Sequence, residues 1–175
     1  MSVFRLTDVS NTDRESKEYW DKRVRENWDT VHHGLYPAQV DAMDKRNIEI
    51  LKFLLLQFDH PVNVLECACG YGRYAIYPTQ LHAPGANYLG IDIVEQSIEE
   101  AKRIYSWSLS DTFRFQTADM STFKTDERFH LIFMVTAWSS IEQRSAELMD
   151  HLKTLLKPGG KIAVLEEKLF MVIEQ

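Results

Sequence analysis

The chain has 175 residues, of which 45% are hydrophobic and 26% charged, a balance typical of a globular protein with one substantial core. Its formal net charge of −6 argues against a broad basic surface for nucleic acid, and no apolar run of about 20 residues, the length that crosses a bilayer, is present. Residues 1–13 are polar and lack the apolar core of a signal peptide, so we expect a cytoplasmic protein without a membrane segment.

Two helices are expected in the first third of the chain. The first would follow the N-cap residues at 11–13 and carries Trp20 and Trp28 on one face. These aromatic side chains would either pack against the domain or shield a bound ligand. The second helix is expected over 38–58, where apolar residues recur at helical spacing.

After Pro61 the pattern changes to strands that alternate with helices. Strands are expected at 62–67, 87–93, 112–116, 129–135 and 161–165, with helices at 72–81, 94–105 and 148–156. Apolar strands separated by amphipathic helices predict an α/β fold with a doubly wound, Rossmann-like and mostly parallel sheet. Residues 61–175 would form this core, and 1–60 a helical lid or cap of the same domain. Ligands of such folds bind beyond the carboxyl ends of the strands.

Small and acidic residues follow the first three expected strands. Alternating small residues in the range 68–72 permit a tight turn and a close approach of a ligand to the backbone. Asp92 ends the second strand, 20 residues after Gly72, where its carboxylate can accept hydrogen bonds from a ribose diol. Asp119 and Met120 follow the third strand and offer a carboxylate and an apolar contact to an adenine. Together these residues predict an adenosine-binding cleft.

The same loop satisfies a second fingerprint. Gly70, Gly72 and Ala75 match the G-x-G-x-x-G/A pattern of dinucleotide-binding proteins, and the spacing to Asp92 suits that pattern as well. The loop alone is therefore compatible with a nicotinamide dinucleotide, with another adenosine-containing ligand, or with a sharp turn that binds nothing.

From about Val62 to Glu167 the chain resembles the class I S-adenosylmethionine-dependent methyltransferases. The motifs that carry this resemblance, in the family's order, are Val64-Leu65-Glu66 with the small-residue loop, Gly90-Ile91-Asp92, Ala118-Asp119, the apolar strand from Phe129 and Leu155-Leu156-Lys157-Pro158-Gly159-Gly160. The last motif favours a methyltransferase over a nicotinamide-dependent enzyme. A looser resemblance, to enzymes that methylate protein α-amino termini, rests on Gly70-Tyr71-Gly72-Arg73 and on the aromatic positions Tyr19-Trp20 and Ala137-Trp138.

The resemblance implies S-adenosylmethionine as the cofactor and gives individual residues a role. The backbone of 68–72 would lie against the methionine part, Glu66 would organise the loop and the ammonium group, and Arg73 would bind the methionine carboxylate. Asp92 would bind the ribose hydroxyls, and residues 119–120 would contact adenine. The implied cofactor-binding set is Glu66, Ala68, Gly70, Gly72, Arg73, Asp92, Ile93, Asp119, Met120, Val135 and Trp20.

The chain departs from the family pattern after its fourth and fifth strands. Residues 135–138 lack the Asn/Asp-Pro-Pro-aromatic motif of enzymes that methylate base amino groups, which argues against a DNA substrate. After the fifth strand, Glu166–Gln175 are too few for the family's helix and antiparallel hairpin, so the hairpin is expected to be absent or the chain incomplete. The apolar residues 169–173 would then pack on the sheet edge or pair with another chain, in a homodimer or with a partner subunit.

The cysteines and histidines predict no metal site. Cys67 and Cys69 would share one face of a strand, a spacing poorly suited to a disulfide, and are interpreted as reduced packing residues. The six histidines are scattered without the spacing of metal ligands. His33, ahead of the core, is the histidine considered as a general base on the substrate side.

Three functions remain open from the sequence. The first is a methyltransferase that acts on a small molecule or a peptide. The second is a subunit that binds S-adenosylmethionine without catalysis, and the third is an NAD-dependent oxidoreductase. Because the sulfonium of the methyl donor is already an activated electrophile, alignment with the acceptor can supply much of the rate, and no catalytic residue is assigned.

Overall fold

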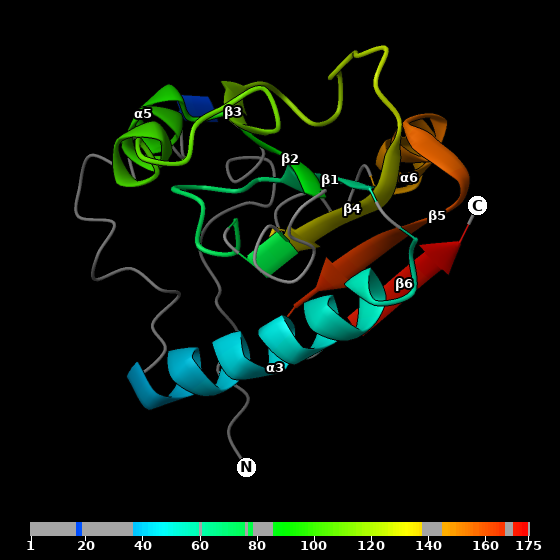
Figure 1. Ribbon diagram of the computed structural model, residues 1–175, viewed down its shortest axis with the longest axis horizontal. Helices are drawn as coiled ribbons and strands as arrows, with labels where there is room; N and C mark the ends of the chain where they lie inside the picture. The colour runs from blue at the N-terminus through cyan, green and yellow to red at the C-terminus, as the bar shows by residue number, and fades with distance from the viewer. Residues whose placement is uncertain are drawn as a thin grey trace.

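A six-stranded sheet runs through the protein in the order β3-β2-β1-β4-β5-β6 (Figure 1). The computed structural model describes residues 17–18, 37–59, 61–75, 77–78, 86–137, 145–166 and 170–174. The strands are β1 Val62–Cys67, β2 Ala86–Asp92, β3 Phe113–Thr117, β4 Phe129–Val135, β5 Leu156–Leu165 and β6 Phe170–Glu174. Strands β1 to β5 pair in parallel, and β6 pairs antiparallel with β5. The predicted doubly wound, mostly parallel sheet is confirmed.

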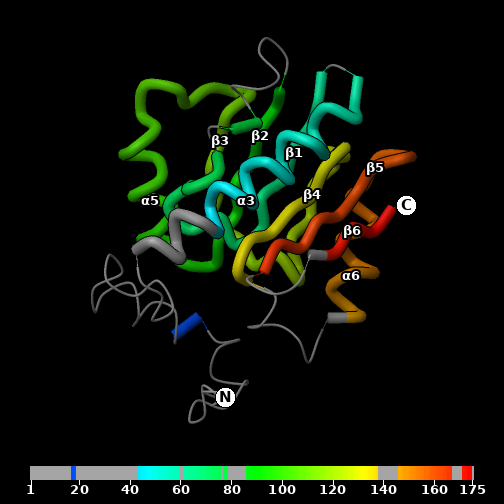
Figure 2. Tube along the Cα trace, turned by 90° about the horizontal axis from the view of Figure 1, so that it is seen from below, coloured from blue at the N-terminus to red at the C-terminus, as the bar shows by residue number. Residues whose placement is uncertain are grey.

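Helices cover both faces of this sheet, as continuous apolar strands require. The helices are α3 Pro37–Leu55, α5 Glu95–Ile104 and α6 Ser145–Thr154. Leu51 and Leu55 of α3 share one core cluster with Ile98 of α5, whereas Leu148 and Leu152 of α6 belong to a second cluster. In Figure 1, α3 runs along one side of the sheet and α6 lies on the other, and Figure 2 shows the strands side by side.

The chain order places the switch point of the sheet beside β1. β1 lies between β2 and β4, and the chain leaves β1 toward β2 and later returns to β4 on the other side. Ligand sites in open α/β sheets form at this point, outside the carboxyl ends of the strands. The loops that follow β1, β2, β3 and β4 therefore define the region of interest.

The prediction of a helix over 72–81 is wrong for its first residues. Residues 70–75 form successive turns, in which the Gly72 N–H donates to the Cys69 carbonyl and the Ala75 N–H to the Gly72 carbonyl. Gly70 and Gly72 have φ of +54° and +83°, values that a right-handed helix does not contain. Within the range 72–81, the structure describes helix only at residues 77–78. The rest of the expected helix, and the expected first helix with Trp20 and Trp28, lie outside the described residues.

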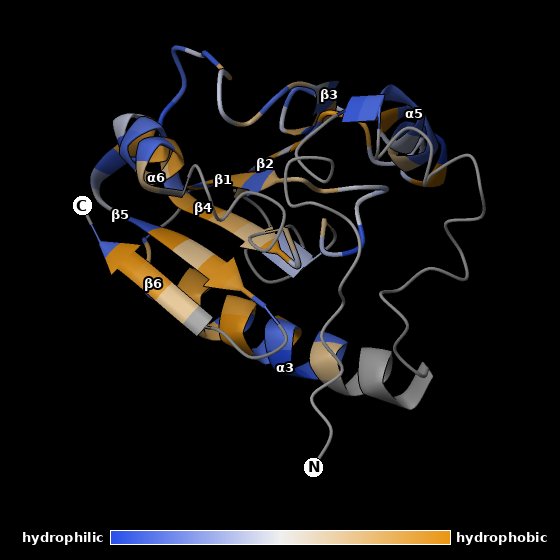
Figure 3. Ribbon diagram, turned by 180° about the vertical axis from the view of Figure 1, so that it is seen from behind, coloured by the Kyte–Doolittle hydropathy of each residue, from blue (hydrophilic) through white to orange (hydrophobic). Residues whose placement is uncertain are grey.

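The C-terminal segment forms β6 on the edge of the sheet. Ile173 pairs with Ile162 and Met171 with Val164 in the antiparallel register of β5 and β6. Figure 3 shows that hydrophobic residues predominate in both strands. Packing of this segment on the sheet edge is therefore confirmed, while association with a second chain through that edge stays a prediction. β5 also begins earlier than expected, at Leu156.

The two cysteines are buried and free, but they do not share a face. Cys67 packs in the cluster that contains α6, whereas Cys69 packs in the cluster that contains α3 and α5. The expectation of a shared face is wrong because β1 ends at Cys67 and Ala68 adopts φ of +55°, which breaks the two-residue alternation of a strand. Within the described residues, no helix combines the length and apolar content needed to cross a membrane.

Candidate functional site

The loop after β1 turns sharply because three of its residues adopt left-handed backbone conformations. Ala68, Gly70 and Gly72 have φ of +55°, +54° and +83°. A Cβ atom on Gly70 would meet no atom of the described residues within 4 Å, so among these residues one side of the loop is open. A Cβ on Gly72 would lie 2.9 Å from ring carbons of both Tyr105 and Phe115, so the other side rests on aromatic rings. The small residues singled out in the sequence thus form a thin loop with one open face.

Asp92, the last residue of β2, holds this loop. Its carboxylate accepts one hydrogen bond from the Gly70 N–H at 2.8 Å and another from the Val94 N–H at 2.9 Å, each on a different oxygen. Burial raises the pKa of this carboxyl, whereas the hydrogen bonds from the backbone amides of Val94, Gly70 and Ile93 lower it. Because a carboxylate has about four lone-pair sites, it can accept a further hydroxyl group beside these backbone amides.

Glu66 is buried within β1, one residue before the strand ends. It is 2% exposed, and its carboxylate accepts a hydrogen bond from the Tyr88 hydroxyl at 2.5 Å. Burial raises the pKa of Glu66 to about 8, against the lowering effect of the Tyr88 hydrogen bond. Gly90, opposite Glu66 in β2, leaves room for this pair, since a Cβ there would lie 2.8 Å from the Tyr88 oxygen. Within the described residues the Glu66 carboxylate is thus hydrogen-bonded to Tyr88 of β2, and its predicted roles toward the loop and toward a donor's ammonium group stay predictions.

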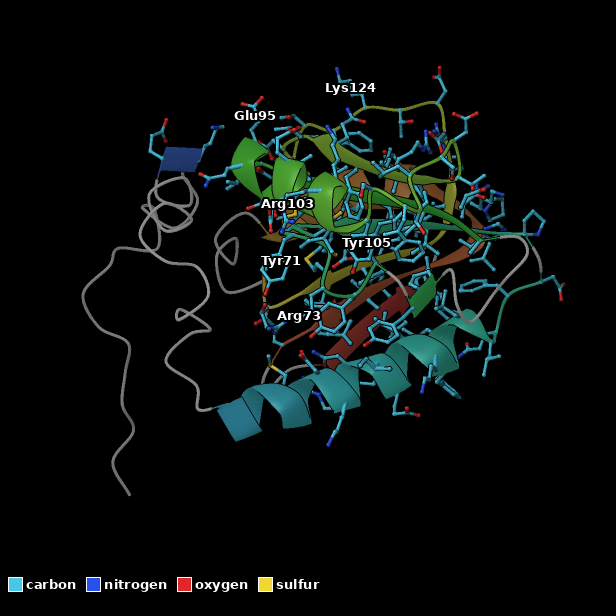
Figure 4. The ribbon with its side chains drawn as sticks, turned by 60° about the vertical axis from the view of Figure 1, so that its left-hand side comes forward. Tyr71, Arg73, Glu95, Arg103, Tyr105 and Lys124 are labelled. Carbon is cyan, nitrogen blue, oxygen red and sulfur yellow. The ribbon has the colours of Figure 1, made fainter. Side chains whose placement is uncertain are left out.

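Arg73 is linked to α3 by an ion pair with Asp44. Its Nη1 atom lies 3.4 Å from Oδ1 of Asp44, and the same oxygen accepts a hydrogen bond from the Tyr74 hydroxyl at 2.5 Å. Both side chains of the pair are about one-quarter exposed, at 26% for Arg73 and 24% for Asp44. Figure 4 shows Arg73 and Tyr71 in the space between α3 and α5. A guanidinium at this position can bind a carboxylate of a ligand.

The end of β3 approaches the end of β2. The Ala118 N–H donates to the Asp92 carbonyl at 2.9 Å, which places the following residues, Asp119 and Met120, next to the same region. Oδ1 of Asp119 accepts hydrogen bonds from both the N–H and the hydroxyl of Ser121, at 2.8 and 2.7 Å. Both Asp119 and Met120 are half-buried. The carboxylate is thus fixed in orientation at the rim of the site.

The remaining predicted residues are distributed as follows. Ile93 directly follows Asp92 and is half-buried, and Val135 ends β4 and is buried. Thr136, next along the chain, has φ of +55°, so the chain turns sharply after β4 as it does after β1. Trp20 lies outside the described residues. Within the described part of the chain, no three His, Cys, Asp or Glu side chains are grouped so that they could hold a metal ion.

Sequence reasoning missed Tyr88, Tyr105 and Asp44. A buried carboxylate on a strand needs a donor, so Glu66 itself signalled that some hydroxyl or amide must lie nearby. Which residue supplies the donor was not readable from the pattern, because Tyr88 is 22 residues away from Glu66 in the chain. Tyr105 looked like the last apolar position of the helix after β2, and nothing in the sequence connected Asp44 with the loop.

The comparisons with known proteins agree with this geometry. A family model described as a methyltransferase domain matches residues 64–160. No curated protein matches the chain in sequence. Among solved structures, the plantazolicin methyltransferase BpumL, in complex with a desmethyl analogue and SAH, is 20% identical with a TM-score of 0.65. That match covers 89% of this chain and 58% of BpumL, so the chain spans less than two thirds of that protein.

Two further structures carry the same fold. Magnesium protoporphyrin IX methyltransferase (ChlM) from Synechocystis PCC 6803, with bound SAH, is 14% identical with a TM-score of 0.63, over 84% of this chain and 68% of that one. N-methyltransferase NodS from Bradyrhizobium japonicum WM9, in complex with S-adenosyl-L-homocysteine, is 22% identical with a TM-score of 0.62. That match covers 83% of this chain and 70% of NodS. At these identities the likeness concerns the fold.

Proposed function

This chain belongs to the methyltransferase domain family, and on that premise we propose that it binds S-adenosylmethionine and transfers its methyl group to a small-molecule or peptide acceptor. The observation that carries the proposal is the junction of Asp92 with Gly70. The carboxylate at the end of β2 fixes the small-residue loop through its backbone amide and still has acceptor positions for hydroxyl groups.

The residues present fit this cofactor. Among the described residues the face at Gly70 is open and leaves space for the methionine part against the backbone, and Arg73 would supply a cation for its carboxylate. Asp92 would accept the ribose hydroxyls, while Asp119 and Met120 would border the adenine. The bound cofactor supplies a methyl group on a positively charged sulfur, and the protein's part is to align it with the acceptor. We assign no general base.

We propose further that residues 1–60 act as a lid or cap over this site. Support comes from α3, the described helix of that segment, since Asp44 contacts both Arg73 and Tyr74. A ligand bound at Arg73 would therefore lie beside this helix. Exclusion of water by such a segment would favour methyl transfer to the acceptor over side reactions.

Isothermal titration with S-adenosylmethionine, S-adenosylhomocysteine and NAD tests the proposed cofactor. We expect the first two to bind and NAD not to bind. Asp92→Ala should weaken the binding at least tenfold, because it removes the acceptor of two backbone amides as well as the ribose contact. Asp150→Ala, an exposed change on α6, should leave binding unchanged and serves as the control.

Binding of NAD alone would contradict the proposal and favour the oxidoreductase instead. Once binding is shown, transfer of an isotope-labelled methyl group to a panel of amines, thiols, hydroxyl compounds and short peptides identifies the acceptor class. Tight binding without transfer to any acceptor would favour the non-catalytic subunit.

A further inference from the structure

Tyr105, at the end of α5, touches the loop after β1 from below. We propose that Tyr105 is a positioning residue, which fixes the Gly72 peptide so that the loop receives the amino-acid part of the cofactor. The inference rests on the proposed function, because it assigns Gly72 to the methionine end of S-adenosylmethionine. Neither the glycine fingerprint nor the acidic strand ends point to this tyrosine.

The contact between Tyr105 and Gly72 is polar and steric at once. The Tyr105 hydroxyl donates a hydrogen bond to the Gly72 carbonyl at 2.7 Å. The ring lies so close to Gly72 that a Cβ atom there would be 2.9 Å from its Cε2 atom. Tyr105 therefore both orients the peptide after Gly72 and limits how far the loop can move toward the sheet.

Two phenylalanine rings hold Tyr105 in this position. Phe115 of β3 stacks on it with a centroid distance of 5.6 Å and an interplanar angle of 26°, and Phe113 meets its edge at 5.5 Å. At the helix end, the Tyr105 N–H donates to the Ala101 carbonyl at 2.9 Å. Backbone and ring are both held, so the hydroxyl is presented at a fixed point, which is what a positioning group requires.

The loop is held from two sides by residues that flank α5. Asp92, just before the helix, accepts the Gly70 N–H, and Tyr105, just after it, donates to the Gly72 carbonyl. The Ala75 N–H occupies the other acceptor position of that carbonyl. With both lone pairs used, the partial negative charge on the Gly72 oxygen is compensated. This favours a carboxylate bound nearby, which an uncompensated carbonyl would repel.

The hydroxyl remains a donor over the physiological pH range. Burial raises the pKa of Tyr105 above its ordinary value, and the charge of Glu66 raises it further. The contact is therefore not expected to act as a pH switch, and removal of the hydroxyl is the change that reveals its role.

The test compares two ligands on Tyr105→Phe, which keeps the ring and removes only the hydroxyl. The ligands are S-adenosylhomocysteine, which has the amino-acid part, and 5′-methylthioadenosine, which lacks it. Isothermal titration should show about fivefold weaker binding of S-adenosylhomocysteine, the loss typical of one neutral hydrogen bond. Binding of 5′-methylthioadenosine should not change. A merely structural role of Tyr105 would weaken both ligands alike.

Two further variants test the support of the Tyr105 ring and provide a control. Phe115→Leu keeps the Tyr105 hydroxyl but removes the ring that supports it. This variant should also bind S-adenosylhomocysteine more weakly, with a smaller change for 5′-methylthioadenosine. Trp107→Phe changes an aromatic side chain that is 72% exposed beside Tyr105 and should alter neither ligand.

Equal affinities for S-adenosylhomocysteine in the wild type and Tyr105→Phe, or a parallel loss of both ligands, overturn this inference alone. Failure of the wild-type protein to bind either ligand overturns the proposed function, and the inference with it.

Discussion

Gly70 and Gly72 are two residues apart, yet they face different surroundings. Both have positive φ, which costs a side-chain-bearing residue about 1–2 kcal/mol. No described residue lies where a Cβ of Gly70 would point, whereas Gly72 rests on the rings of Tyr105 and Phe115. The glycine at 70 is thus needed for backbone conformation and ligand approach, and the glycine at 72 also for packing.

Matched alanine substitutions separate these two requirements. Gly70→Ala should lower the free energy of unfolding by about 1 kcal/mol, from backbone strain alone. Gly72→Ala should lower it by about 3 kcal/mol, because the new methyl group also overlaps the buried ring of Phe115 and the half-buried ring of Tyr105. Urea unfolding followed by tryptophan fluorescence measures both values. Equal losses in the two variants would show that the rings move aside without cost.

At the scale of secondary-structure elements, α3 is joined to the loop after β1 by a carboxylate and an amide. Asp44 accepts the Tyr74 hydroxyl and lies near Arg73, and Asn47, one turn further along α3, donates to the Tyr74 oxygen at 3.3 Å. Apolar residues of the same helix pack on the sheet. The helix therefore binds the core through its apolar side and the loop through its polar side.

Asp44→Ala tests the polar half of this attachment. We expect the free energy of unfolding to fall by about 2 kcal/mol, since a buried hydroxyl loses a charged acceptor. The control is Glu49→Ala on the same helix, which breaks an exposed ion pair with Lys52 and should cost less than about 0.5 kcal/mol. Denaturant titration distinguishes the two. A loss for Asp44→Ala no greater than that of the control would mean that α3 is held by its apolar side alone.

Considered as a whole molecule, the protein should lose stability as the pH rises toward 8. The pKa of Glu66 is raised by burial from 4.5 to about 8, so the folded protein keeps a proton there that the unfolded chain releases. Because the folded state binds this proton more tightly, the contribution of Glu66 to the free energy of unfolding is fully present below pH 4.5. It is lost as the pH rises from 4.5 through 8. The slope attributable to one such group is at most about 1.4 kcal/mol per pH unit.

Glu66→Gln should remove this dependence, because the amide keeps the shape and an acceptor for Tyr88 but carries no charge. The melting temperature of the variant should exceed that of the wild type at pH 8, with a much smaller difference at pH 4.5. Glu99→Gln, which changes an exposed residue of α5, is the control and should follow the wild type at both values. A wild-type curve that is as flat as that of Glu66→Gln would refute the prediction.

Local patterns in the sequence predicted the alternation of strands and helices and the place of the proposed site. The limits of β1 and β4 were predicted at 62–67 and 129–135, where the structure has them. Asp92 and the small residues at 68–72 were also identified, because a tight turn and a strand end require particular residue types within a few positions of one another. Periodicity and turn chemistry are local properties, and they are readable from one sequence.

Only the tertiary structure decided which side chains meet. Tyr105 reaches Gly72 across 33 positions of the chain, and Tyr74 reaches Asp44 across 30. The separation of the two cysteines and the antiparallel pairing of β6 also depend on it. Such contacts follow from how α3 and α5 pack on the sheet, and many residues at the same positions satisfy the same hydrophobic pattern. The pattern thus specifies a buried face, while close packing in three dimensions specifies the partner.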